Sequence, residues 1–338
     1  MLTKDSLPSE ITIEDVLTHP IMHIPKTQKL SSDKPLDQQI KEKQRTLKLL
    51  KKAYDRDVYD DPAERLGFLP PFFAQFSLPH VEPEYDDIKF GNPNYQITMY
   101  SSKGLPFGCI PRLFLAYICG EIRETGSPII SINANQTQFL KTLNLPNTGR
   151  YALKFRKQAV RLLSTVICIY KYSLSENDKV LDWSFLNCSI VRNGKFRFLE
   201  RSALPENSPT WESRLELSED FVNLINHGKF PFSFDTYVAL KQSTLAMDIY
   251  AWANYRVYIL NKTINKHSKG VAYIPFELLQ NQFMPFGKSE TRFFKRRFLQ
   301  RLDEVSILWN DLKKYTDVSK DGKSLIIKAG KPHIDPQR

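Results

Sequence analysis

Long apolar runs are missing from this sequence of 338 residues, which argues against a protein that spans a membrane with helices. No stretch approaches the roughly 18 consecutive apolar residues that a membrane-spanning helix needs. The first 17 residues carry acidic side chains and lack the apolar segment of a secretory signal peptide. We therefore expect a cytoplasmic protein that has no membrane partner.

Cysteine and histidine are scarce, which argues against a metal site. The four cysteines are widely spaced, contain no CxxC motif and are expected to be reduced thiols. The six histidines contain no His-x-His pair, which is the metal-binding motif of the enzymes that nick DNA in rolling-circle replication. His19 and His23 are separated by Pro20, so a metal site is not expected there either.

Motifs that carry enzyme chemistry are also missing. The sequence contains neither the phosphate-binding GxxxxGK[ST] loop nor the GxSxG turn of a serine nucleophile. Two adjacent acidic pairs, Asp60-Asp61 and Asp86-Asp87, are expected to be solvated loop residues, because neighbouring side chains seldom converge on one site. We predict that the protein is not an enzyme and needs no cofactor and no metal.

Basic residues are in clear excess. The formal net charge is +11 at pH 7, and the sequence pI is about 9.3. Such a charge favours a polyanionic partner. Nucleic acid and an anionic membrane surface both meet this requirement on charge alone.

Composition and breaker residues divide the chain into three parts: residues 1–65, 66–240 and 241–338. The first is predicted to be a mobile leader with a charged helix at 36–57, whose face of Leu36, Ile40, Leu47, Leu50 and Tyr54 suits an exposed or partner-bound helix. That helix could lie on DNA, on an acidic partner or free in solvent. The proline- and aromatic-rich residues 66–93 are predicted to be an extended segment without regular structure.

The second part predicts one particular order of elements. A helix at 110–124 precedes a strand at 129–132 and a small helix that begins at Asn135 or Thr137. A turn at 146–149 then leads into a long helix at 150–171. The next segment, 180–201, is predicted to be a hairpin that turns at Asn193-Gly194, in the position of a wing.

The third part repeats that order with a helix at 242–260, a strand at 271–274, a small helix at 276–283 and a long helix at 289–315. A hairpin around Asp321-Gly322 ends it. From the small helix onward the two copies align without a gap at an offset of 139 residues, as between Leu140 and Leu279. We predict an α+β fold with two tandem winged helix-turn-helix domains.

Both long helices carry basic residues in their first half. In the first, Arg150, Lys154, Lys157 and Arg161 form one stripe at helical spacing. Its predicted core face consists of Leu153, Val160, Leu163, Ile167 and Tyr170. In the second, Ser289, Arg292 and Arg296 lie opposite a core face predicted from Phe294, Phe298, Leu302, Val305, Trp309 and Leu312.

A helix-turn-helix places its second helix in the major groove of DNA, where arginine and lysine contact guanine edges and neutralise phosphates. The alternative for each stripe is a solvated helix face. The two stripes follow equivalent turns, which favours DNA. The predicted DNA-binding residues are Arg150, Lys154, Lys157, Arg161, Arg192, Lys195, Arg197, Lys288, Ser289, Arg292, Lys295 and Arg296.

The segment from Gly104 to Cys119, GLPFGCIPRLFLAYIC, resembles the RepA-type plasmid replication initiators. In that family a GLP-(F/Y)-G-x-x-P-R segment opens a helix, and a TGGR-like turn precedes a basic helix. The corresponding turn of this chain, Asn147-Thr148-Gly149-Arg150, has one glycine fewer. The resemblance covers about residues 95–260.

The resemblance implies a protein that binds repeats, or iterons, in the double-stranded DNA of a plasmid origin. It further implies recruitment of the host replication initiator and helicase, repression of its own promoter, and a switch between a homodimer and a monomer. Two alternatives stay open: a transcriptional repressor of a mobile element, which would bind a palindrome, and a rolling-circle initiator, which would nick DNA.

Overall fold

The computed structural model describes nine segments of the chain, and all structural statements concern these residues. They are 36–59, 65–92, 95–132, 136–174, 181–196, 213–226, 230–264, 269–284 and 290–334. The predicted mobile leader before residue 36 therefore lies outside the described residues. Among the described helices, none is both long and apolar enough to cross a membrane. The mixture of helices and sheets confirms the predicted α+β class.

The C-terminal part of the chain has the connectivity of a winged helix. A three-stranded antiparallel sheet with the order β10-β12-β11 packs beside its helices. Tyr273 pairs with Ile326, which also faces Asp317 on the other side. The elements are α9 (Thr244–Lys262), β10 (Val271–Pro275), α10 (Phe276–Phe283), α11 (Thr291–Leu308), α12 (Leu312–Tyr315), β11 (Thr316–Val318) and β12 (Ser324–Lys328).

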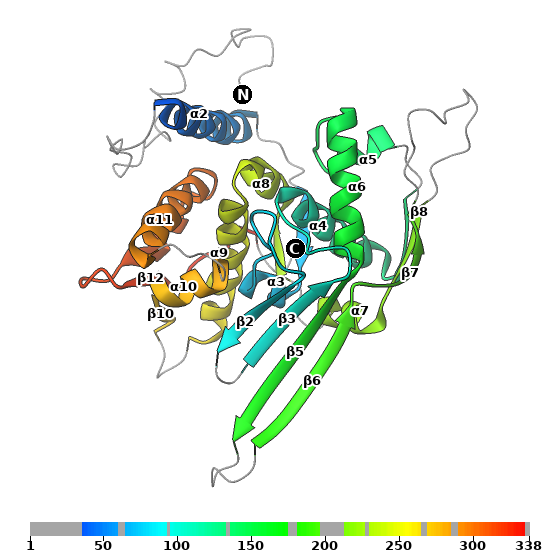
Figure 1. The fold of residues 1–338 in the computed structure, drawn as a ribbon. Coiled ribbons are helices and arrows are strands. Elements are labelled where there is room, and N and C mark those ends of the chain that lie inside the picture. The colour runs from blue at the N-terminus through cyan, green and yellow to red at the C-terminus, as the bar shows by residue number, and fades with distance from the viewer. Residues whose placement is uncertain are drawn as a thin grey trace, which may run out of the picture.

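The preceding unit has the same connectivity, with the strand order β4-β8-β7. A hairpin is inserted between its long helix and its second strand, and this hairpin extends from the body of the molecule (Figure 1). The elements of the unit are α4 (Cys109–Thr125), β4 (Ile129–Ile132), α5 (Gln136–Thr142), α6 (Gly149–Leu163), β7 (Val191–Lys195) and β8 (Ser213–Leu217). The inserted strands are β5 (Thr165–Leu174) and β6 (Leu181–Ser189).

The predicted long helix 150–171 is wrong in its second half. The helix α6 ends at Leu163, and residues 165–174 form β5 instead. Ile167 and Ile169 are buried on one face of β5, while the alternate residues Val166 and Cys168 are only half-buried. This period of two, in a segment rich in β-branched residues, is typical of a strand.

The predicted core face of this helix is wrong at Leu153 and Val160, whereas Leu163 packs against the core and Ile167 is buried in β5. Leu153 is 68% exposed and Val160 is 36% exposed. The buried face consists of Phe155, Ala159 and Leu162, together with Gln158.

The predicted turn at Asn193-Gly194 is wrong as well. Both residues lie inside β7, which pairs with β8 and carries an irregularity between Val191 and Asn193. The wing of the first unit is therefore the β7–β8 pair. The chain between these strands, residues 197–212, lies outside the described residues.

Residues 66–93 contain regular structure that the sequence pattern did not predict. Strand β1 (Leu66–Leu69) pairs antiparallel with β9 (Phe230–Ser233), as between Phe68 and Pro231. Helix α3 (Pro71–Gln75) follows β1. Strand β2 (Asp87–Asn92) joins β3 (Tyr95–Ser101) in a four-stranded sheet with the order β2-β3-β5-β6.

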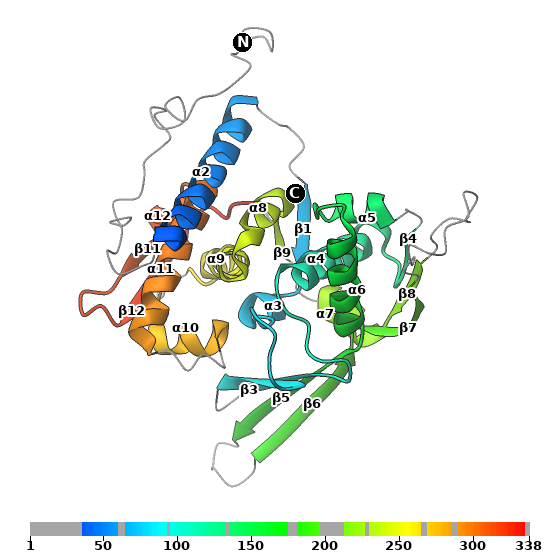
Figure 2. The ribbon, with the colours of Figure 1, turned by 45° about the horizontal axis from the view of Figure 1, so that its top comes forward.

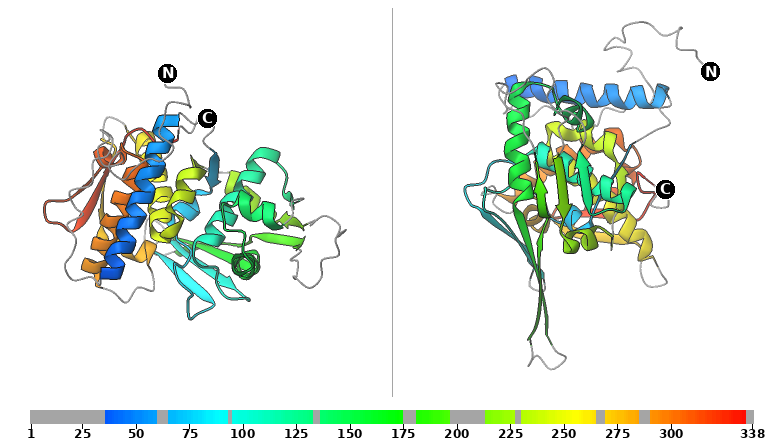
Figure 3. Two further views of the ribbon diagram at one scale, coloured as in Figure 1. Left: turned by 90° about the horizontal axis from the view of Figure 1, so that it is seen from above. Right: turned by 90° about the vertical axis from the view of Figure 1, so that its right-hand side faces the viewer.

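The charged helix α2 (Leu36–Tyr59) packs on its own chain, beside α11 (Figures 2 and 3). Its buried apolar residues are Leu49, Leu50 and Ala53, whereas Ile40 of the predicted apolar face is 46% exposed. Arg45 donates hydrogen bonds to Glu304 of α11. The Nζ of Lys52 lies 3.0 Å from the carbonyl oxygen of Asp235. None of the three predicted environments is the one observed, because the helix packs against other parts of its own chain.

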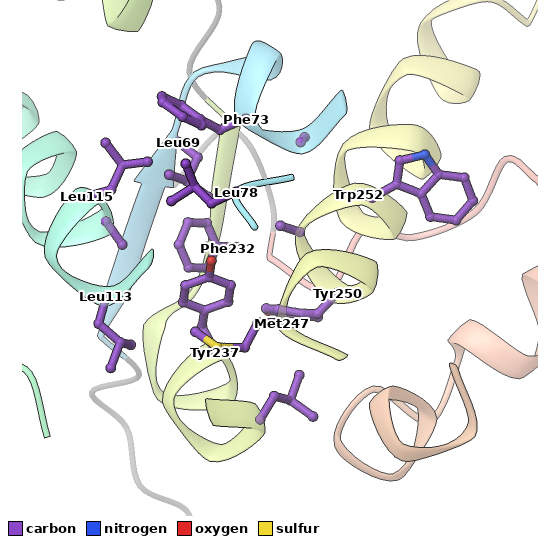
Figure 4. Packing of buried hydrophobic residues seen from close by; sticks show 14 of the residues in the cluster. Leu69, Phe73, Leu78, Leu113, Leu115, Phe232, Tyr237, Met247, Tyr250 and Trp252 are labelled. Carbon is purple, nitrogen blue, oxygen red and sulfur yellow. The ribbon is translucent and has the colours of Figure 1, made fainter. Parts of the chain in front are cut away.

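The two winged units share one apolar core (Figure 4). Leu113 and Leu115 enter it from α4, and Met247, Tyr250 and Trp252 enter it from α9. The same core includes residues of β1 and β9, and of the short helices α7 (Glu219–Asn226), α8 (Phe234–Ala239) and η3 (Leu240–Gln242). The predicted domain boundaries at residues 66 and 241 stay a prediction, because the core continues across residue 241.

Candidate nucleic-acid interface

The helix α6 is held by its cap and by one buried face. Thr148 at the N-cap accepts a hydrogen bond from the backbone N–H of Tyr151, which fixes the first turn. Phe155 packs against Phe114 of α4, with ring centroids 5.3 Å apart. The buried Gln158 accepts a hydrogen bond of 2.8 Å from the backbone N–H of Phe107. These contacts direct the remaining faces of α6 to solvent.

The first half of α6 is basic and exposed. The helix contains Arg150, Lys154, Arg156, Lys157 and Arg161 and no acidic residue. The first four of these side chains are exposed, and the Nζ of Lys154 lies 5.6 Å from the ring centroid of Tyr151. The sequence pattern missed Arg156, because the helical register predicted for the core was wrong.

The second half of the predicted stripe is engaged inside the molecule. Glu82, from the loop before β2, accepts hydrogen bonds from Lys157 at 3.0 Å and from Arg161 at 2.6 Å. These two hydrogen bonds hold the pKa of the Glu82 carboxyl below its usual value. Arg161 also donates to the carbonyl oxygen of Leu105 and lies 5.2 Å from the ring centroid of Phe107. Arg150 and Lys154 of the stripe are therefore exposed to solvent, whereas Lys157 and Arg161 are hydrogen-bonded to other parts of the chain.

The helix α11 confirms the core face predicted for the second unit. All six residues are buried, with exposures of 6% or less: Phe294, Phe298, Leu302, Val305, Trp309 and Leu312. Phe298 packs against Trp252 of α9, with ring centroids 6.1 Å apart. The helix ends at Leu308, earlier than the predicted residue 315, and the short α12 follows.

The exposed face of α11 presents an aromatic ring between arginines. Phe293 is 43% exposed, and the guanidinium carbons of Arg292 and Arg296 lie 4.7 and 5.8 Å from its ring centroid. Arg292 also pairs with Glu290 at 2.7 Å. Arg297 is exposed on this helix too, and the sequence pattern had not selected it. These guanidinium groups are positioned on the first turns of the helix, where a recognition helix contacts base edges.

Lys295 has a different environment from the one predicted. Its Nζ donates a hydrogen bond of 2.6 Å to the carbonyl oxygen of Gly322, in the turn between β11 and β12. It also lies 5.2 Å from the ring centroid of Phe276. Lys295 therefore ties the second wing to α11. The predicted Lys288 and Ser289 lie outside the described residues.

The remaining predicted residues belong to the first wing. Arg192 and Lys195 are exposed on β7, and Arg192 lies 3.6 Å from Glu216 on β8. Arg197 lies outside the described residues. Although the predicted hairpin was wrong, Arg192 and Lys195 still lie on a wing strand, because β7 is the first strand of the wing.

The described residues include no group of three or more histidine, cysteine, aspartate or glutamate side chains that could hold a metal ion. All four cysteines are free thiols; Cys119 and Cys188 are buried, and Cys109 and Cys168 are half-buried. Burial raises the pKa of Cys188 to about 11, so this thiol is protonated at neutral pH.

No family model matches this chain, and neither does any curated protein. Two solved structures that are similar to it contain domains 2 and 3 of RctB, and both are 13% identical in sequence. The match to the first, a selenomethionine derivative, covers 77% of this chain and 98% of the RctB chain, with a TM-score of 0.47. The match to the second covers 77% of this chain and 97% of the RctB chain, with a TM-score of 0.42. These scores are too low to assign a function, so the winged-helix topology rests on the strand pairing of this chain.

Proposed function

We propose that this chain binds double-stranded DNA through its two winged-helix units and initiates replication of a plasmid. The observation that carries DNA binding is the repeated geometry. Each unit has a helix whose first turns expose basic side chains, beside a strand pair in the position of a wing. A helix of this kind fits the major groove, and a wing can contact the neighbouring backbone.

Electrostatics support the same proposal. The protein carries a formal net charge of +11. Arg292, Arg296 and Arg297 form a cluster on the first half of α11, while its acidic residues Asp303 and Glu304 lie in the second half. This polarity suits a helix that enters the groove with its N-terminal end. Contacts between basic side chains and phosphates give affinity and make it depend on salt.

The initiator role rests on the RepA-like segment from Gly104 to Cys119. On that basis the DNA is a set of origin repeats, and the partners are the host replication initiator and helicase. The protein also represses its own promoter, by binding a related sequence as a homodimer. It acts in the cytoplasm, is not an enzyme and needs no cofactor.

A footprint on the DNA that flanks its own gene tests this proposal. An initiator protects tandem repeats spaced by about one helical turn, roughly 10 base pairs. A single protected palindrome would favour the alternative, a transcriptional repressor without a role in initiation. The absence of any protected segment would contradict both proposals.

A second experiment addresses the nicking alternative. The purified protein is incubated with supercoiled origin plasmid and Mg²⁺ or Mn²⁺, and the products are separated on a denaturing gel. We expect no strand cleavage and no covalent product. A tyrosyl–DNA adduct would overturn the non-enzymatic assignment.

A further inference from the structure

The RepA-like segment contains a buried arginine that DNA binding does not explain. Gly104 and Gly108 have φ angles of 80° and 82°, in the left-handed region that favours glycine, and Gly108 is the N-cap of α4. Four residues later, Arg112 is only 2% exposed. A buried guanidinium group needs acceptors for its five N–H groups.

Arg112 finds these acceptors on three parts of the chain. Its Nε and Nη2 lie 2.7 and 2.6 Å from the two carboxylate oxygens of Asp248, on α9 of the second unit. Its other donors point at the carbonyl oxygens of Leu78, Pro79 and Gly108. Arg112 therefore joins the first helix of one unit to the first helix of the other.

His80 adds a second connection at the same place. Its Nε2 lies 2.8 Å from the carbonyl oxygen of Phe283, at the end of α10, and its Nδ1 lies 2.8 Å from the hydroxyl of Thr244. A carbonyl only accepts, so Nε2 carries the proton and Nδ1 accepts from the hydroxyl. Residues 78–80 thus connect the Arg112 guanidinium, through the carbonyls of Leu78 and Pro79, to the first turn of α9, through His80.

Each of the two joined helices, α4 and α9, packs against one of the basic helices. Phe114 of α4 packs against Phe155 of α6, and Trp252 of α9 packs against Phe298 of α11. The orientation of α4 against α9 therefore sets that of α6 against α11, which lie on opposite sides of the centre of the molecule (Figures 1 and 2).

We propose that the Arg112–Asp248 pair fixes the spacing between the two DNA segments that the winged units read. A buried, bidentate ion pair favours one geometry strongly, whereas its contribution to stability is offset by desolvation. Both residues are positioning residues. This inference rests on the proposed binding of DNA by both units.

The first test measures, without DNA, how rigidly the Arg112–Asp248 pair holds the two units together. Spin labels are attached through ketone-bearing amino acids at the exposed Lys141 and Lys313, one on each unit, in the full chain. Pulsed dipolar spectroscopy then gives the distribution of distances between the labels. We expect a narrow distribution for the otherwise unchanged protein.

The variants remove the pair in two ways. Arg112→Met with Asp248→Leu fills the site without charge, and Arg112→Lys keeps the charge but lacks the planar fork. We expect broader distributions in both, while a matched control at the surface pair, Asp311→Ala with Lys314→Ala, stays narrow. If the distance distributions of both Arg112 variants match that of the control, the Arg112–Asp248 pair does not hold the two units in one orientation, whatever the protein binds.

The second test uses duplexes that carry the footprinted segments with 5 base pairs inserted between them. The insertion rotates one segment by about half a helical turn, so the unmodified protein should lose about tenfold or more in affinity. The Arg112→Met, Asp248→Leu variant should lose less than about threefold, because its units can reorient. Equal losses in both proteins would overturn the inference, whereas failure of the unmodified protein to bind any duplex would instead overturn the proposed function.

Discussion

At the scale of single residues, the acid Glu82 decides how much of α6 is available to a phosphate. It pairs with Lys157 and Arg161, and its carboxylate is half exposed, with a relative accessibility of 50%. A DNA phosphate that approaches α6 competes with Glu82 for the ammonium group of Lys157, whose side chain is 55% exposed. Arg150 and Lys154, by contrast, are exposed one to two turns before this pair.

Replacing this acid should strengthen DNA binding. Glu82→Gln frees Lys157 for a phosphate, so the affinity should rise several-fold and the slope of log K against log salt should steepen by about one. Fluorescence anisotropy with a labelled duplex measures both quantities. Glu84→Gln, two residues away at an exposed acid, is the matched control. If the two variants behave alike, Glu82 does not compete with DNA.

The buried pair makes a prediction about stability. Arg112→Met alone leaves the Asp248 carboxylate buried without its partner, so the free energy of unfolding should fall by about 3–5 kcal/mol. Adding Asp248→Leu removes the unpaired charge and should recover part of this loss. Urea unfolding followed by circular dichroism measures the difference. A double variant less stable than Arg112→Met would show that the single variant's defect is not an unpaired charge.

At the scale of elements, His80 links the loop before β2 to α9 and α10, and its protonation should weaken that link. Burial, together with the nearby Arg112, lowers the pKa of His80 from 6.5 to about 4, against the opposing effect of Asp248. The folded state therefore prefers the neutral ring. The stability that this preference gives is present above pH 6.5 and is lost as the pH falls toward 4.

The loss between these pH values should reach about 3 kcal/mol, since each tenfold change in proton affinity equals about 1.4 kcal/mol. Unfolding in urea at a series of pH values from 7 to 4 measures it. His80→Gln, which cannot take up a proton, should flatten the curve in this range. An unchanged slope in that variant would assign the acid sensitivity to other groups.

The elements also show why the sequence predicted the second unit better than the first. In α11 and at its C-cap, the large aromatic residues Phe294, Phe298 and Trp309 mark one face without ambiguity, and all are buried. After α6 no glycine or proline separates Leu163 from the apolar segment of β5, so the pattern extended the helix too far. Ser164 ends α6, and the period changes from helical to alternating at this point.

Long-range pairing explains the other errors. Asn193-Gly194 is a strong turn signal, yet Gly194 is needed for another reason: a Cβ there would lie 2.9 Å from the carbonyl oxygen of Arg214 on β8. Glu82 and Lys157 are 75 residues apart in sequence, so no local pattern could reveal their contact. Arg112 belongs to the segment that resembles the RepA family, but its partner Asp248 lies 136 residues further along the chain, so the local sequence did not predict their pairing.

At the scale of the whole molecule, two winged helices of equal connectivity share one core, and α2 packs beside the second. In the proposed function, both α6 and α11 contact DNA at once. If only one did, the basic residues of the other would be an ordinary solvated face. The contribution of each helix can be separated, because each exposes its own set of basic residues.

The salt dependence of DNA binding tests this central claim most directly. The affinity of the full chain for its footprinted duplex is measured from low to high salt for three variants. Arg150→Ala with Lys154→Ala and Arg292→Ala with Arg296→Ala each remove two charges from one helix. Lys89→Ala with Lys262→Ala removes two exposed lysines outside both helices.

Each helix variant should bind more weakly, and each should reduce the slope of log K against log salt by up to about two, while the lysine control keeps the original slope. If one helix variant kept the affinity and slope of the unmodified protein, its helix would not contact DNA. If both helix variants did so, the assignment of α6 and α11 as DNA-binding helices would be wrong.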